Sequence, residues 1–218
     1  MKTSVPITTL LCAAPAAAAS PATLDKRALP ECQVTTISTG NFDLKPALPI
    51  GVEPGSDPYN TGVLNYENFQ LVKVNLTDSD TVKSTLKPPT SPNALSTIPF
   101  NTNVPTFVRS DESVNRFTLD KLSYACAQLQ LSVVPLSCKF QLTAKKADRS
   151  VVDPQMLTYS PQDFTNADGT VGFKTTQLDQ PKFTDLHSVE LKLLSGGLLA
   201  STINVLFDNV AATACLIG

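Results

Sequence analysis

The sequence predicts an all-β domain, an antiparallel β-sandwich of the jelly-roll type held by two disulfides. Three observations lead to this fold class. Seventeen prolines, together with many Thr, Val, Ser and Leu residues, oppose long helices and favour short strands joined by turns. Hydrophobic and polar residues alternate over several short segments. Turn residues separate these segments at regular intervals, a pattern typical of sandwiches and jelly rolls.

The amino terminus has the features of a secretion signal. Lys2 precedes an uncharged stretch whose apolar centre covers residues 7–18, and small residues follow over 16–20. We therefore predict a signal peptide over residues 1–19. A membrane anchor is the less favoured alternative, because the apolar stretch contains two prolines and is shorter than the roughly 20 residues that cross a bilayer.

A dibasic pair, Lys26 and Arg27, follows the signal in a short polar stretch. Cleavage by a kexin-type protease would remove residues 20–27 as a propeptide; two ordinary surface charges are the alternative. Residues 28–218 have a suitable length for one β-sandwich domain. Dibasic cleavage at this place is typical of fungal secretion, so we expect a secreted fungal protein of the extracellular space or cell wall.

The net charge of the chain indicates which classes of partner are disfavoured. A formal net charge of −2 lacks the basic excess that attracts nucleic acid or anionic lipid. We expect neither as a partner. We also expect no membrane association once the signal is removed, because no later segment is long enough to span a bilayer.

The cysteines predict disulfides, because an exported chain folds in an oxidising compartment. Cys12 falls in the signal. The remaining cysteines are Cys32, Cys126, Cys138 and Cys215, and four cysteines permit three pairings. We favour Cys126–Cys138, which would join neighbouring strands, and Cys32–Cys215, which would join the ends of the domain. A zinc site is disfavoured, because the close Cys-x-x-Cys spacing is missing.

Alternation places the expected strands at 33–38, 69–76, 117–126, 137–143, 155–159, 189–193 and 202–210. Within 117–126, Phe117 and Leu119 share one face, whereas Leu122 and Tyr124 continue on the opposite parity. This change predicts a bulge near Asp120 and Lys121. Breaker-rich segments at 46–60, 87–105 and 166–172 are expected to be loops. Asn75 begins the only Asn-x-Ser/Thr sequon, so we expect a glycoprotein with Asn75 at the surface.

Several short motifs resemble a family. They are Phe42-Asp43, the segment from Gly62 to Phe69, the strand from Phe117 to Cys126, Pro135 to Cys138, and Leu206 to Val210. Their order is similar to that in fungal secreted proteins of uncharacterised function that look like galactose-binding-domain-like jelly rolls. The resemblance implies two stacked antiparallel sheets and, by analogy, carbohydrate binding. One departure is Tyr66, where relatives commonly have Trp; this chain has no Trp.

Counting histidines narrows the enzyme classes. His187 is the only one, too few for a copper monooxygenase with two His ligands, and no Gly-x-Ser-x-Gly elbow accompanies it for a Ser-His-Asp triad. We expect His187 to be a surface residue at a strand edge. A glycosidase needs only two carboxylates at a fixed separation, and no spacing in this chain selects such a pair. We therefore predict no catalytic residues.

A sugar site needs an aromatic face together with planar polar groups. The best candidates lie in or beside the long loop that ends at residue 60. The predicted ligand-binding residues are Tyr59, Asp57, Asn60, Tyr66 and Glu67. The alternatives are that Tyr59 packs under its own loop and that Glu67 closes a turn.

Asp43 and Asp208 lie near the two ends of the domain, which the predicted Cys32–Cys215 disulfide would bring together. Their carboxylates, with nearby carbonyls, could hold a structural Ca²⁺. Separate hydrogen bonding by each Asp is the alternative, and we predict no other cofactor.

Taken as a whole, the sequence favours a non-catalytic extracellular binding module, with cell-wall carbohydrate as the predicted ligand. A secreted protein-interaction protein, an effector or surface antigen, is the alternative. A glycoside-cleaving enzyme is the third hypothesis.

Overall fold

The computed structural model describes residues 34–40, 42, 59–60, 63–74, 85–90, 93–97, 104–110, 114–129, 133–195 and 202–216. The chain divides into two units, Met1–Pro30 and Glu31–Gly218, and every described residue belongs to the second. The predicted signal peptide and the pair Lys26 and Arg27 lie outside the described residues.

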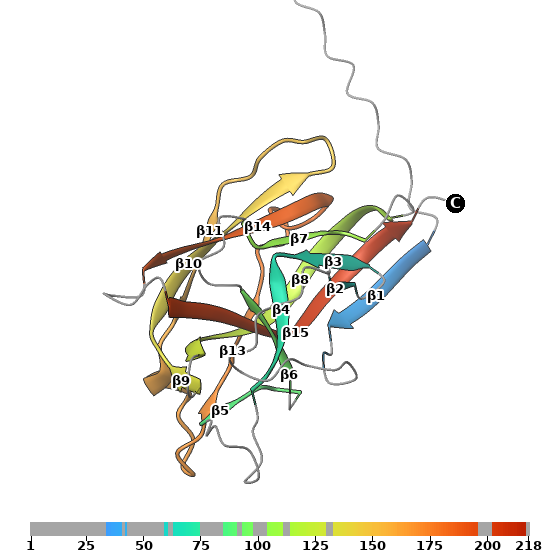
Figure 1. Ribbon diagram of the computed structural model, residues 1–218. Coiled ribbons are helices and arrows are strands. Elements are labelled where there is room, and N and C mark those ends of the chain that lie inside the picture. The colour runs from blue at the N-terminus through green and yellow to red at the C-terminus, as the bar shows by residue number, and fades with distance from the viewer. Residues whose placement is uncertain are drawn as a thin grey trace, which may run out of the picture. The chain divides into compact units, whose positions relative to one another are not determined.

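Two long antiparallel strands form the centre of the domain. β8 (Val114–Leu129) and β15 (Ile203–Leu216) pair along most of their length and lie side by side in Figure 1. Shorter strands line their other edges. Along β8 these are β9 (Val133–Pro135), β13 (Lys174–Gln177) and β14 (Leu186–Ser195), and along β15 they are β6 (Asn93–Thr97) and β1 (Val34–Gly40).

The remaining strands extend this sheet, again with antiparallel pairing. From β14 it continues through β7 (Thr106–Arg109) and β3 (Leu64–Glu67) to β2 (Tyr59–Asn60), and also through β10 (Cys138–Lys146) to β11 (Gln155–Tyr159). From β6 it continues to β4 (Phe69–Lys73). A separate parallel pair joins β5 (Leu86–Lys87) to β12 (Val171–Gly172).

This organisation confirms the predicted all-β class. Among the described residues, the helical structure is limited to a 3-10 turn at Pro161–Phe164 and to Thr202, which is also in 3-10 conformation. The same residues contain no helix with the length and apolar character needed to span a membrane.

Aromatic rings show how the sheet encloses its core. Phe69 of β4 stacks on Phe107 of β7 with ring centroids 5.1 Å apart, although these strands are not paired. Phe207 of β15 meets both rings edge-on at 6.0 and 5.5 Å, and meets Phe140 of β10 at 6.0 Å. The sheet therefore curls so that two parts of it face each other, and edge-to-face pairs stabilise the contact.

The predicted bulge in β8 is confirmed. The register steps from Lys121 opposite Ala211 to Leu119 opposite Ala212, so Asp120 is the extra residue. The bulge keeps both Leu119 and Leu122 fully buried in spite of their odd spacing. Tyr124 is fully buried as well, as its parity predicts, and its hydroxyl donates to the carbonyl of Thr158 over 3.1 Å.

Each of the segments expected to be loops contains a strand. β6 lies within 87–105, β12 within 166–172, and β2 ends the segment 46–60. The clearest reason is seen in β6, whose five residues Asn93–Thr97 are all buried. A strand buried on both faces shows no alternation, and the prolines around it dominate the local pattern.

The predicted disulfide Cys126–Cys138 is confirmed. It joins β8 to the first residue of β10, with the Cα atoms 6.1 Å apart, and closes the segment that contains β9. Cys32 lies outside the described residues, so the Cys32–Cys215 disulfide stays a prediction.

A buried carboxylate ties a peripheral segment to the central strands. Asp208 of β15 is completely buried and accepts hydrogen bonds from the backbone N–H of Thr90 at 2.8 Å and from its hydroxyl at 2.7 Å. A third comes from the N–H of Asn209 at 2.7 Å, where the backbone adopts a φ of 49°. Buried charge needs such donors, because desolvation is otherwise costly.

The substitution Asp208→Asn tests this contact. An amide keeps the shape but replaces one acceptor oxygen by a donor group, which would face donors already in place. We expect the free energy of unfolding to fall by about 1–3 kcal/mol, measured by urea denaturation. Asp153→Asn, at an exposed residue before β11, is the matched control and should change stability little. Equal stabilities for the two variants would contradict the assignment.

Candidate functional site

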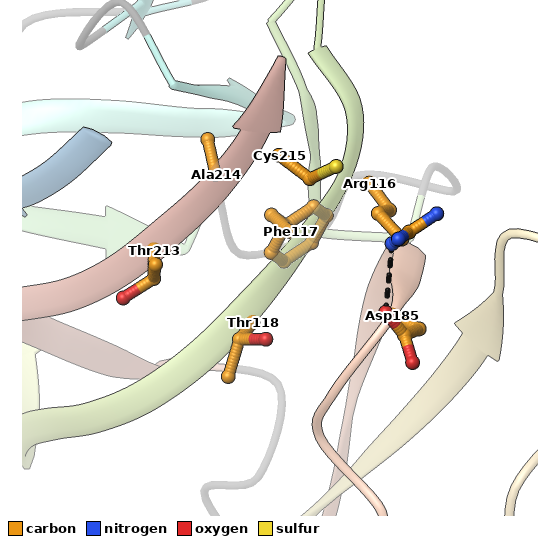
Figure 2. Close-up of a pocket in the computed structure, with 7 residues that line it drawn as sticks. All are labelled: Arg116, Phe117, Thr118, Asp185, Thr213, Ala214 and Cys215. Carbon is orange, nitrogen blue, oxygen red and sulfur yellow. Dashed lines mark ion pairs between the residues drawn. The ribbon is translucent and has the colours of Figure 1, made fainter. Parts of the chain in front are cut away.

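A small pocket lies where the beginning of β8 and the end of β15 meet the residue before β14 (Figure 2). Its volume is about 80 Å³, and it is lined by Arg116, Phe117, Thr118, Asp185, Thr213, Ala214 and Cys215. This space holds several water molecules or one end of a sugar-sized ligand. It is the natural candidate site among the described residues, because it combines polar and charged side chains with a concave surface.

The pairing of β8 with β15 explains which side chains share the pocket. Arg116 lies opposite Cys215, and Thr118 lies opposite Thr213. Opposite residues of an antiparallel pair share one face, and so do positions two apart, so these four residues occupy the same face. The residues between them, Phe117 and Ala214, are each only 1% exposed and belong to the core.

An ion pair forms the polar part of the pocket. Arg116 Nε lies 2.8 Å from Asp185 Oδ1, and Figure 2 shows the two side chains meeting from different elements. The side chain of Arg116 is only 13% exposed, whereas that of Asp185 is 55% exposed. The pocket therefore presents a carboxylate to solvent beside a guanidinium that is largely withdrawn from it.

The loop before β14 holds Asp185 in place. Phe183 is buried, and its carbonyl accepts a hydrogen bond from the N–H of Leu119 in β8 at 2.9 Å. The carbonyl of Asp185 itself accepts from the N–H of Ala147 at 2.8 Å, and Lys146 Nζ donates to the carbonyls of Pro181 and Thr184. Asp185 adopts a φ of 53°, which a non-glycine residue rarely does. Such strained positions often occur at functional sites.

His187 lies beside the pocket, in β14. Burial, followed by the nearby cations Arg109, Arg149 and Lys145, lowers the pKa of its imidazole, and Glu67 opposes the effect only weakly. The neutral form is therefore favoured near pH 7. His187 is partly buried in a strand that is paired on both sides, rather than at the edge of the sheet that we expected.

The structure places the predicted ligand-binding residues in different environments. Tyr66 is 1% exposed and packs edge-on against Phe42 and Phe107, each 5.6 Å away, and also contacts Phe69. The expectation that Tyr66 offers a ring to a ligand is wrong, because the ring fills the core. Glu67 is exposed at the end of β3.

The strand β2 brings the other candidates beside β3. Tyr59 lies opposite Tyr66 and Asn60 opposite Asn65 in the register. Asp57 lies outside the described residues. The structure thus places Tyr59, Asn60 and Glu67 on the neighbouring strands β2 and β3, and none of the three is among the residues that line the pocket.

The predicted calcium site finds no support from Asp208. Its carboxylate accepts hydrogen bonds from Thr90 and Asn209, which is the alternative that the sequence left open. Asp43 lies outside the described residues, as does the glycosylation candidate Asn75. Within the described ranges, no group of three or more His, Cys, Asp and Glu side chains could hold a metal ion.

Arg116 and Asp185 were not singled out by the sequence. Each is an ordinary charged residue in its own segment, and no local pattern connects the two. They meet because Leu186 of β14 pairs with Phe117 of β8 in antiparallel register. Asp185 and Arg116 are then diagonal neighbours on one face, and their side chains bridge this separation. Only the sheet topology contains this information.

Comparisons with known proteins give no functional assignment. No family model and no curated protein matches the sequence. Among solved structures, one similar chain is a DUF4465 family protein from Bacteroides caccae, with a TM-score of 0.44 and 9% identity, covering 87% of this chain and 96% of that one. Another is an apo form cyclase from Fischerella sp., with a TM-score of 0.34 and 14% identity, covering 89% and 93%. Similarity this weak supports no inference about function.

Titration of His187 tests the electrostatics around the site. Since it is the only histidine, a single imidazole signal can be followed by NMR. We expect a midpoint below the ordinary value of 6.5. The unfolded chain then binds the proton more readily than the folded one, so native stability should decrease as pH falls through 6.5 towards the lower folded midpoint.

The substitution Arg149→Gln should raise the midpoint of His187, because it removes one of the cations that disfavour protonation. Lys139→Gln, at an exposed position at the other end of β10 from Lys145, should leave it unchanged. A midpoint of 6.5 or higher in the unsubstituted protein would contradict the structure.

Proposed function

We propose that this chain is a secreted, non-catalytic module that binds cell-wall carbohydrate, and that the Arg116–Asp185 pocket receives hydroxyl groups of the ligand. The observation that carries the proposal is the ion pair inside a concave site, with its carboxylate 55% exposed. Sugar hydroxyls both donate and accept hydrogen bonds, so a site for them needs adjacent donors and acceptors.

The chemistry of the pocket suits two neighbouring hydroxyls. One can accept from an N–H of Arg116 while the next donates to Oδ2 of Asp185, since Oδ1 is engaged by Arg116. Thr213 donates its hydroxyl proton to Asp120 Oδ2 at 2.9 Å, which directs its remaining lone pairs elsewhere as acceptors. Phe117 and Ala214 also line the pocket, but they are each only 1% exposed and belong to the core.

The tyrosines limit the mode of binding. Tyr66, Tyr124 and Tyr159 are at most 2% exposed, so none of these rings can stack on a sugar. Tyr59 remains the candidate for a stacking contact, as the sequence predicts. A pocket of about 80 Å³ without these rings fits the end or a branch of a glycan better than a long flat run of it.

A protein-interaction role is the second candidate, and strand β11 favours it. In the described part of the chain β11 pairs only with β10, and its Met156 is 42% exposed. Leu194 of β14, the strand on the other side of β10, is 40% exposed. An unpaired strand edge with apolar side chains nearby can add a strand from a partner.

The jelly-roll arrangement, export and the Cys32–Cys215 disulfide belong to the same proposal. Cys215 is disulfide-bonded, and β1 pairs with β15 so that Val34 lies opposite Leu216. This register places Val34, two residues after Cys32 in the sequence, at the end of β15 that carries Cys215. A disulfide at Cys126–Cys138 supports an oxidising compartment as the site of folding.

The disulfide pairing can be tested by mass spectrometry of an unreduced digest. We expect two cross-linked peptides, one joining Cys126 to Cys138 and one joining Cys32 to Cys215. Alkylation before reduction should label neither Cys32 nor Cys215. A labelled Cys32, or Cys215 linked to another cysteine, would contradict the pairing.

Carbohydrate binding can be tested by pull-down on insoluble glycans and by a glycan array, with the mature chain and the variants Asp185→Asn and Arg116→Gln. A lost hydrogen bond to a charged group costs about 1.5–3 kcal/mol, so each variant should bind about 10- to 100-fold more weakly. Asp153→Asn, an exposed carboxylate outside the pocket, should bind normally. Circular dichroism checks that each variant is folded.

The other outcomes separate the hypotheses. Retention on no glycan, together with capture of a specific protein that is lost on substitution of Met156, would favour the interaction protein. Release of reducing sugar from a glycan would identify an enzyme and overturn the non-catalytic proposal.

A further inference from the structure

The arginines of the domain gather at one corner. The sequence contains four, of which Arg27 lies in the predicted propeptide. The remaining three, Arg109, Arg116 and Arg149, come from β7, from β8 and from the turn after β10. Segments far apart in the sequence thus bring every arginine of the folded domain to the neighbourhood of Asp185 and His187.

Hydrogen bonds between these segments define the corner. Arg109 Nη1 donates to the carbonyl of Val114 at 3.1 Å, which joins the end of β7 to the beginning of β8, two residues before Arg116. The turn that carries Arg149 is closed by its own N–H, which donates to the carbonyl of Lys146 at 2.9 Å. The next link, from Ala147 to the carbonyl of Asp185, connects this turn to the pocket.

The cations at the corner differ in how they are neutralised. Arg116 is paired with Asp185, and Lys145 is paired with Glu190. Within the described residues, neither Arg109 nor Arg149 forms an ion pair. After burial, both contribute to the lowered pKa of the His187 imidazole, so both lie within electrostatic range of this side chain.

The backbone conformation at Arg149 is unusual and supports a role for this residue in binding. Its φ of 70° lies in the left-handed region, so two of the four described non-glycine residues with positive φ, Arg149 and Asp185, occur at this corner. Asp148 forms a local turn instead of pairing with Arg149, because its Oδ1 accepts from the N–H and hydroxyl of Ser150 at 2.9 and 2.6 Å. The guanidinium of Arg149 therefore stays available on an exposed residue.

We propose that Arg109 and Arg149 bind the acidic groups of an anionic glycan whose hydroxyls enter the Arg116–Asp185 pocket. The inference rests on the proposed function and narrows its ligand to polysaccharides that carry carboxylate or sulfate. The planar guanidinium is suited to such groups, because it can donate two parallel hydrogen bonds to a pair of oxygens.

The charge of the whole chain argues for a sparsely charged ligand. At a formal net charge of −2, the protein repels a dense polyanion at long range. A nucleic-acid backbone carries one charge per about 1.7 Å of duplex, more than two unpaired arginines can match. Acidic sugars spaced along a polysaccharide need only local, short-range contacts, which this corner supplies.

Partly methyl-esterified polygalacturonate, whose carboxylates are spaced along the chain, is the probe for a carboxylate ligand. The fully esterified polymer is the matched control, because esterification removes the charge and keeps the sugar. A sulfated galactan and a neutral galactan form the second pair and separate sulfate from carboxylate recognition. Binding is measured with the full mature chain at low salt and at about 0.5 M salt, where exposed charges are screened.

The variants are Arg149→Gln, Arg109→Gln and the double substitution. The Arg109→Gln variant loses the hydrogen bond from Arg109 to Val114. If this loss destabilises the fold, Arg149→Gln still tests the proposal, because it removes only an exposed side chain. We expect about 10-fold weaker binding of the acidic polymer for each single variant and about 100-fold for the double variant. About 0.5 M salt should likewise weaken binding of the acidic polymer by the unsubstituted protein. Binding of the esterified polymer should change less than twofold. Lys139→Gln is the charge-matched control away from the corner.

Two results would overturn the inference, and they can be told apart. If acidic and neutral polymers bind equally, or if the arginine variants bind the acidic polymer normally, the corner does not recognise acid groups, while carbohydrate binding stands. If no glycan of either pair is retained, and the glycan array is negative as well, the proposed function and the inference fail together.

Discussion

The pairing of β8 with β15 is the constraint on which the rest of the domain depends. These two strands pair with each other along most of their length, and shorter strands pair along their other edges. The bulge at Asp120 allows β8 to bury residues of both parities. Cys126 links the same strand covalently to β10, and Asp208 of β15 fastens the segment that contains Thr90. The same ladder also sets Arg116 opposite Cys215 at the pocket.

The core uses most of the aromatic side chains, and this determines what is left for recognition. Tyr66, Phe69, Phe107 and Phe207 form a continuous set of ring contacts between facing parts of the sheet. Tyr124 and Tyr159 direct their hydroxyls to the carbonyls of Thr158 and Gly172, which satisfies them inside the protein. The surface chemistry near the pocket is therefore carried by charged groups and hydroxyls. A ligand with many hydroxyls matches that chemistry better than an apolar one does.

Electrostatics at the corner differs from the charge of the chain as a whole. The protein is slightly acidic, yet its arginines converge where β7, β8 and the turn after β10 meet. Local arrangement of this kind decides which ligands are accepted, because screening limits the reach of exposed charges to about 8–10 Å. Burial first, and then the cations at this corner, lower the pKa of the His187 imidazole. Composition alone would have argued against any anionic ligand.

The sequence by itself determined the all-β class, the bulge near Asp120 and the burial of Tyr124, because alternation and parity are local properties of the chain. It favoured the Cys126–Cys138 disulfide among three possible pairings, and the structure decided for it. It failed for β6, where burial on both faces removes alternation, and for Tyr66, whose position before a strand suggested a surface. The pocket and the arginine corner were decided only by the tertiary structure. Arg116, Asp185 and Arg149 lie in separate segments, and they come together through pairing between strands, which depends on the fold and leaves no signal in the pattern of any one segment.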